Sequence, residues 1–182
     1  MTQYIDKYLD ESLRVAKLQL ELKPTFLEIA NQVLERVLQD GTVFFCGNGG
    51  SAADSQHLAA ELVGRFKKNR KPIRSISLTT DTSIITSTGN DFSFDEIFSR
   101  QLTAIGRKGD VLIAISTSGE SKNVINAVNY ANEIGMLTIA FTKKDDNSLS
   151  SITKLCLPIP SQETGVIQQG HITFGQLLCY FL

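Results

Sequence analysis

The sequence contains no tryptophan, and its 182 residues include only three cysteines, four prolines and two histidines. Long apolar runs are also missing: the closing stretch 177–182 is far shorter than the ~20 residues that a membrane-spanning helix needs. The N-terminal residues MTQYIDK have neither the basic segment nor the apolar segment of a secretory signal. These absences predict a cytoplasmic protein that does not enter a membrane.

Neither sign of charge dominates, because 18 lysines and arginines face 19 aspartates and glutamates. A net charge of −1 gives no field that would attract nucleic acid or an anionic membrane, so we expect neither as a partner. With 42% apolar and 20% charged residues the chain should fold, and its length fits one domain over residues 1–182. Cys46, Cys156 and Cys179 lie in separate apolar runs without CxxC spacing, which predicts three buried thiols.

Two amphipathic helices are predicted before the first strand. Apolar residues recur at helical spacing through residues 5–22, and again from Phe26 to Leu38, where Asp40-Gly41 ends the pattern. In the first helix the apolar positions are spread widely, so this helix is expected to pack on two sides. One sheet face cannot bury such a surface, and we therefore expect residues 1–40 to contribute to packing between subunits.

From residue 42 onward, short apolar runs rich in β-branched residues alternate with helical patterns. The predicted strands are 42–46, 73–78, 111–115, 137–141 and 155–159. The predicted helices are 51–66, one after Asp81, 95–105, 121–134 and one from about 162 to the end. Strands that alternate with helices predict an α/β fold with a doubly wound, five-stranded parallel sheet.

The first strand is followed directly by the turn Gly47-Asn48-Gly49-Gly50-Ser51 and then by a helix. Ligands of doubly wound sheets bind at such turns, where glycines let the backbone approach and a helix N-terminus offers free N–H groups. The turn matches neither the Walker motif nor the GxGxxG spacing. A ligand-binding loop and a plain tight turn with Ser51 as helix cap are equally compatible with it.

A second turn, residues 116–121, also follows an apolar strand and opens a helix. It carries four hydroxyl side chains, whereas one would suffice for a helix cap. Hydroxyls gathered at a helix N-terminus favour the binding of a phosphate group. Together the two turns predict a small phosphorylated ligand at the carboxyl edge of the sheet.

His57 and Glu61 are four residues apart in one predicted helix, so both project from the same face. Such a pair can be half of a metal site, a general acid–base pair or a plain surface contact. For an arbitrary helix the surface contact is favoured, but this helix starts at the candidate ligand loop. Taken alone, Asn90-Asp91 indicates an Asx turn, and the amides of Gln168 and Gln176 indicate an exposed helix face.

Four motifs in order, GNGGSAADSQHLAAEL, TGNDFSFDEIFSRQ, GDVLIAISTSGES and the IQ-x-x-H of residues 167–171, together resemble the sugar isomerase (SIS) domain family. Within it they are similar to the phosphoheptose isomerases. The resemblance implies a flavodoxin-like SIS fold with two N-terminal helices and a cytoplasmic homotetramer whose sites are shared between subunits. It also implies conversion of sedoheptulose 7-phosphate to D-glycero-D-manno-heptose 7-phosphate, the first step of the activated-heptose pathway for bacterial surface polysaccharide.

The resemblance also assigns roles to residues of this sequence. Glu61 would be the catalytic carboxylate, and one zinc ion per subunit would be held at the positions of His57, Glu61, Gln168 and Gln176. The substrate-binding positions would be Asn48, Gly49, Gly50, Ser51, Asn90, Asp91, Ser116, Thr117, Ser118, Ser121 and Gln168.

At two positions the sequence departs from the phosphoheptose isomerases. Gln176 stands where they carry a histidine that serves as acid–base group and metal ligand, and Gly165 stands where they usually carry an aspartate. His171 matches a histidine of the family that is not a ligand. A sister SIS family, which binds the replication initiator DnaA, also lacks the late histidine and is the alternative. Glu61, which that family does not keep, favours the isomerase.

Overall fold

The alternating pattern becomes a parallel sheet between helices in the computed structural model, which describes residues 2–182. The elements are, in chain order, α1 (Thr2–Leu18), η1 (Gln19–Leu22), α2 (Lys23–Leu38), β1 (Val43–Gly47), α3 (Gly50–Val63), β2 (Ser75–Ser77), α4 (Thr82–Asp91), η2 (Phe94–Glu96), α5 (Ser99–Ile105), β3 (Val111–Ile115), α6 (Lys122–Glu133), β4 (Leu137–Lys143), α7 (Ser148–Ile152), β5 (Leu155–Ile159) and α8 (Thr164–Phe181).

The five strands lie in the order β2-β1-β3-β4-β5, and every neighbouring pair is parallel. This is the flavodoxin-like order, so the predicted doubly wound fold is confirmed. The order reverses between β1 and β3, which are adjacent in the sheet. The loops that follow these two strands, residues 47–51 (the glycine turn) and residues 116–121 (the hydroxyl turn), therefore emerge side by side at the carboxyl edge.

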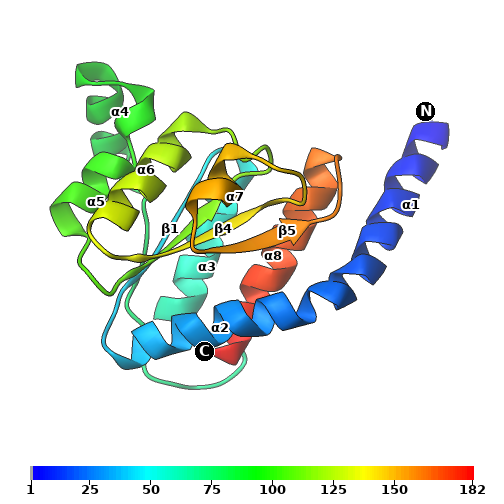
Figure 1. The fold of residues 1–182 in the computed structure, drawn as a ribbon, viewed down its shortest axis with the longest axis horizontal. Helices are drawn as coiled ribbons and strands as arrows, with labels where there is room; N and C mark the ends of the chain where they lie inside the picture. Colours follow the sequence, from blue (N-terminus) through cyan, green and yellow to red (C-terminus); the bar gives the residue numbers. More distant parts are fainter. Residues whose placement is uncertain (1) are drawn as a thin grey trace.

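Each central strand is buried on both faces, because helices cover the sheet on either side (Figure 1). In β1, Val43 and Phe45 pack into the core beneath α2, α3 and α8. Phe44 and Cys46 point the other way, into the core beneath α5 and α6. This alternation explains why the strands consist of continuous apolar runs rather than alternating polar and apolar residues.

The N-terminal helices form a bent arm along the α8 side, and the first part of α1 stands away from the sheet (Figure 1). The single helix expected through residue 22 ends at Leu18 and continues as the 3₁₀ turn η1. Val15 is the one residue of α1 that is buried among those described, while Leu9 and Leu13 remain more than half exposed. The packing on two sides that we expected for this helix is therefore not made within one chain.

Several element boundaries differ from the sequence-based expectation. The second strand is only Ser75–Ser77, and the helix expected over 95–105 is divided into η2 and α5. The short helix α7 was not predicted; the Asn147 side chain caps it by accepting from the Ser150 backbone N–H. Of the three thiols, those of Cys46 and Cys179 are buried as expected, but Cys156 is only partly buried.

Between Thr2 and Leu182 no helix is both long enough and apolar enough to span a membrane.

Candidate active site

The glycine turn brings backbone and side chains unusually close. Gly49, the residue that precedes α3, has a φ of 57°, a conformation that favours glycine. At Gly50 a Cβ atom would collide with the side chain of Gln168 from α8. Ser51 is not the helix cap that the sequence allowed: it lies inside α3, where its carbonyl accepts from the Ser55 hydroxyl at 2.7 Å. The turn therefore leaves its N–H groups without a side-chain cap within the described chain.

In the hydroxyl turn, Ser116 is the buried centre of a small cluster. Its Oγ lies 3.4 Å from Ser118 Oγ and 3.1 Å from Ser121 Oγ, and it accepts from the Gly119 backbone N–H at 3.1 Å. Ser121 immediately precedes α6, yet its hydroxyl makes no capping bond to that helix in the described residues. Capping therefore does not account for this hydroxyl, which stays available to an anion at the N-terminus of α6. Thr117, the residue after Ser116, is half-buried.

A pair of amides links the two turns. Asn48 Nδ2 donates to Asn123 Oδ1, and Asn123 Nδ2 donates back to Asn48 Oδ1, both at 2.9 Å. Asn123 lies in the first turn of α6. This pair of hydrogen bonds therefore fixes the glycine turn against the helix that follows the hydroxyl turn. The sequence pointed to Asn48 but not to Asn123, because a single asparagine in a helix carries no signal of a partner 75 residues away.

Helices α3 and α8 run side by side from the same edge of the sheet. Their contact begins with Gly50 against Gln168 and continues with Leu58 against Gly175, where a Cβ atom would meet the leucine side chain. Further along, the Cys179 thiol faces the Leu58 carbonyl at 3.7 Å. Burial raises the pKa of Cys179 to about 12, and the negative charge of nearby Glu61 adds to the effect.

This alignment places three of the predicted residues together at the middle of the two helices. His57 Nε2 lies 3.5 Å from Glu61 Oε1 and 3.4 Å from Gln176 Nε2. The cluster is open to solvent, since the side chains of His57 and Glu61 are 46% and 24% exposed. Gln168 is not part of this contact; it lies two helical turns earlier on α8, against the glycine turn.

Asp54 is a residue of this helix face that our reading of the sequence missed. It is one turn after Gly50 and one turn before His57, and its Oδ2 is enclosed without a hydrogen-bond partner in the described structure. Burial raises the pKa of Asp54, and the neighbouring His57 opposes that rise. An i, i+3 spacing to His57 was visible in the sequence, but its burial was not.

His171 does not turn into the cluster. Its side chain is 1% exposed on the inner face of α8, with its ring centroid 6.1 Å from that of Phe141. Within the described chain neither ring nitrogen meets a partner in hydrogen-bond geometry. Burial lowers the pKa of His171 to about 4, and the nearby backbone of Thr142 opposes this only in part. His171 is therefore a neutral core residue.

Asn90 and Asp91 lie apart from the other predicted site residues. They are the last two residues of α4, not a separate turn, and the Asn90 amide donates to Asp91 Oδ1 at 2.8 Å. Both are exposed, and among residues 2–182 neither forms a hydrogen bond with the two turns or with His57.

At Gly165, Tyr8 from α1 occupies the space that a side chain would need. A Cβ atom there would collide with the hydroxyl of Tyr8 from α1, and Gln169 Nε2 donates to the same hydroxyl at 3.3 Å. One turn further along α1, Glu11 accepts from Ser161 at 2.6 Å and from Arg14. The bonds from Arg14 and Ser161 lower the pKa of Glu11 to about 2. These contacts fasten α1 to the start of α8.

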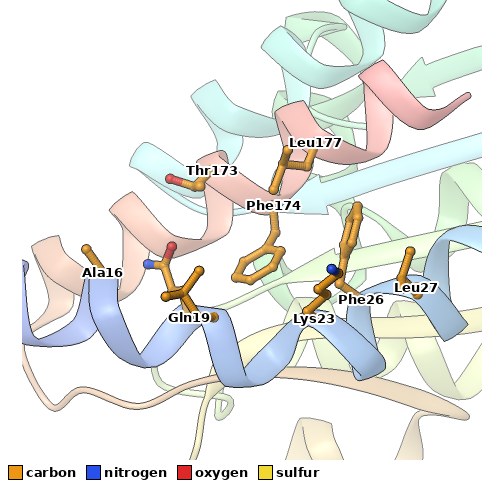
Figure 2. Close-up of a pocket in the computed structure, with 9 residues that line it drawn as sticks. Ala16, Gln19, Lys23, Phe26, Leu27, Thr173, Phe174 and Leu177 are labelled. Carbon is orange, nitrogen blue, oxygen red and sulfur yellow. The ribbon is translucent and has the colours of Figure 1, made fainter.

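An apolar cavity of about 400 Å³ lies elsewhere, between the N-terminal arm and α8 (Figure 2). Phe26 and Phe174 pack against each other on its wall, with ring centroids 5.5 Å apart, and Gln19, Lys23 and Leu177 also line it. None of its lining residues belongs to the two turns or to the His57 cluster. It is a feature of the helix arm rather than of the candidate active site.

The parallel sheet, with its two linked loops at the switch point, matches a known class of protein. Residues 4–143 match the family model described as the SIS domain. The chain belongs to the SIS domain family.

Named relatives show which members of the SIS domain family the chain is most similar to among those compared. A phosphoheptose isomerase from Rhodospirillum rubrum is 51% identical over 156 residues, which cover 86% of this chain and 83% of that protein. One from Aquifex aeolicus is 46% identical, with 94% of each chain covered. The solved structure of the phosphoheptose isomerase from Neisseria gonorrhoeae superposes with a TM-score of 0.91 at 39% identity, covering 98% of this chain and 96% of that one. Within the SIS domain family, the chain thus groups with the phosphoheptose isomerases.

Proposed function

We propose that the chain is an aldose–ketose isomerase that converts sedoheptulose 7-phosphate to D-glycero-D-manno-heptose 7-phosphate. The observation that carries the proposal is the position of Glu61: its carboxylate lies 3.5 Å from His57, on the helix that begins at the glycine turn. The names of the relatives support the same activity. Such an enzyme would supply the first step of the activated-heptose pathway, and we expect it in the cytoplasm.

The reaction moves one proton between adjacent carbons through an enediol, so it needs a base that can take the proton and return it. Glu61 is the carboxylate placed to do this, and it is exposed enough to reach a substrate. His57, beside it, can exchange protons with the sugar hydroxyls. Asn48 and the N–H groups at the start of α3 would hold the sugar chain.

The phosphate of the substrate would bind at the hydroxyl turn. Ser116, Thr117, Ser118 and Ser121 surround the N-terminus of α6, whose N–H groups and partial positive charge favour an anion. Anchoring the phosphate, at one end of the substrate, restricts the motion of the reacting carbons at the other end. The amide pair between Asn48 and Asn123 keeps the two binding loops in register.

The zinc ion that the resemblance implies remains a prediction, and the donor chemistry of this chain does not fit it. Catalytic zinc sites take three protein ligands from histidine, cysteine and acidic side chains. Within the described part of the chain no three such groups converge. His57 and Glu61 supply one imidazole and one carboxylate, and the other two predicted positions are amides. The proposed proton transfers therefore use protein groups alone.

The quaternary arrangement is also part of the proposal: a homotetramer with sites shared between subunits. Its support is the apolar surface that one chain leaves uncovered on α1, where Ile5, Leu9 and Leu13, spaced four residues apart on one helix face, are 50%, 55% and 63% exposed. Exposed apolar residues in such a row are typical of an interface. The apolar cavity between the N-terminal arm and α8 adds uncovered apolar surface, and Ala16 of α1 is among the residues that line it (Figure 2).

The DnaA-binding alternative has in its favour only the absence of the late histidine, at Gln176. Its proteins share the loops but, as the resemblance has it, lack the carboxylate that Glu61 provides.

A turnover assay on sedoheptulose 7-phosphate tests the proposed function. Replacing Glu61 with Gln keeps the shape and removes the base, so the rate should fall by about 100- to 10,000-fold. Glu35→Gln, an exposed change on α2, is the matched control and should leave the rate unchanged. A Glu61→Gln variant as active as the unmodified chain would refute the role of Glu61, and an inactive unmodified chain would refute the function.

Sedimentation velocity tests the tetramer. Leu13→Glu places a charge on the exposed apolar row and should shift the tetramer toward smaller species, whereas Lys7→Glu, on the same helix, should not. A monomeric unmodified chain at micromolar concentration would contradict the proposal.

A further inference from the structure

The cluster at His57 is built around one atom. Both contacts of the imidazole, from Glu61 Oε1 at 3.5 Å and from Gln176 Nε2 at 3.4 Å, converge on Nε2 of the ring. Gln176 reaches this point because α8 lies against α3, with Gly175 packed on Leu58. The amide is half-buried, so the packing of α8 limits its freedom.

The distances between these atoms would allow a bound metal ion, but the chemistry of the donors does not favour zinc. Two ligands of a tetrahedral zinc ion, with bonds of about 2.0–2.2 Å, lie roughly 3.4 Å apart, so the distances alone would admit a metal. The donors do not, because a neutral amide is a weaker zinc ligand than imidazole, thiolate or carboxylate. No third group of those types converges on this site from elsewhere in residues 2–182.

The residues nearest to the cluster do not complete a donor set. Gln168 is packed against the glycine turn, where it occupies the space that a side chain at residue 50 would need. The second histidine, His171, is enclosed on the opposite face of α8. Asp54 lies one helical turn before His57, but one of its oxygens is enclosed within the protein.

We infer that the His57–Glu61–Gln176 cluster works without zinc, and that Gln176 is a positioning residue that holds the His57 imidazole beside the Glu61 carboxylate. The amide N–H, as it lies, can donate to an unprotonated Nε2, and with its nitrogen and oxygen exchanged the amide can accept from a protonated Nε2, so it can restrain either tautomer of the ring. It cannot exchange a proton itself at neutral pH, which leaves that chemistry to the pair it holds. The inference about turnover rests on the proposed function, whereas the inference about zinc does not.

Zinc titration by calorimetry tests the metal part directly, with no reference to activity. The unmodified chain should show no saturable site at micromolar zinc. Gln176→His adds a second imidazole at the cluster and should bind zinc at least about 10- to 100-fold more tightly. Gln169→His adds a histidine at the residue next to Gln168, about two helical turns before Gln176 and toward Tyr8, and should behave as the unmodified chain. One tight zinc site per unmodified chain would overturn the inference.

Kinetics test the positioning part. Turnover by the unmodified chain should survive chelator treatment and should not rise when zinc is added. Gln176→Leu removes the amide at similar volume and should lower kcat with little change in KM, and Gln176→Asn should recover part of the loss. An unchanged kcat in Gln176→Leu, with a melting temperature like that of the unmodified chain, would refute the positioning role, as chelator-sensitive turnover would refute metal independence. If no variant turns over sedoheptulose 7-phosphate, the proposed function fails while the zinc titration still decides the metal question.

Discussion

The chain's two histidines lie beside opposite faces of α8, in contrasting surroundings. Toward α3, Gln176 meets His57 in a cluster where the histidine side chain is 46% exposed. Toward the sheet, His171 is 1% exposed and its ring lies beside that of Phe141. The chain has only two histidines, and they differ in surroundings rather than in type. One face of this helix thus holds a residue of the proposed proton-transfer cluster, while the other face contributes to the core.

The largest expected effect on the inner face comes from Phe174→Ala. Phe174 is 4% exposed and packs against Phe26, so its loss should lower the free energy of unfolding by about 3 to 5 kcal/mol. Urea denaturation measures this, with the exposed Thr173→Ala as control. If Phe174→Ala left stability intact but removed activity, the division between the two faces would be wrong.

Lowering the pH should reduce the free energy of unfolding, because His171 is buried in its neutral form. Its pKa is about 4 in the folded chain against an ordinary 6.5, so the unfolded chain binds a proton more readily between these values. The free energy of unfolding should therefore fall as the pH drops from about 6.5 to 4, by about 3 kcal/mol in all. His171→Leu should remove this component when denaturation curves of the two proteins are compared across that range. Identical pH dependence in both would contradict the assignment.

The hydroxyl turn offers the smallest effect and the sharpest contrast with the inner face of α8. Ser121→Ala or Ser118→Ala should weaken binding of the sugar phosphate by about 1 to 3 kcal/mol, because each would remove one of the proposed hydrogen bonds to the charged phosphate. Stability should shift less, since in the described structure Ser121 makes no capping bond. Calorimetry on both variants measures the affinity, and unchanged values would remove these hydroxyls from the site.

Much of the fold followed from local patterns. Continuous apolar runs between helical segments were enough to predict five parallel strands, because each pattern reflects burial of its own residues. The short helix α7 escaped because five residues carry too little periodicity, and the exposure of α1 escaped because a pattern shows an apolar face but not what covers it.

The candidate site divides in the same way. The glycine turn, the hydroxyl turn and the pair His57–Glu61 are readable because their members are close in sequence. The contacts that join them are not, since Asn48 meets Asn123 over 75 residues and His57 meets Gln176 over 119. Asn90 and Asp91 show the reverse: a motif pointed to them, yet within the described chain they join no other site residue by a hydrogen bond.

The two loops, the carboxylate at Glu61 and the amide at residue 176, where the resemblance led us to expect an imidazole, were all recognisable before the fold was known. That Gln176 faces His57 while His171, five residues earlier, is enclosed depends on the packing of α8. The reason is geometric: an α-helix turns by about 100° per residue, so residues five apart point to different sides. Which side becomes a site depends on how α8 is rotated when the sheet buries its apolar face against Phe141 and Ile159.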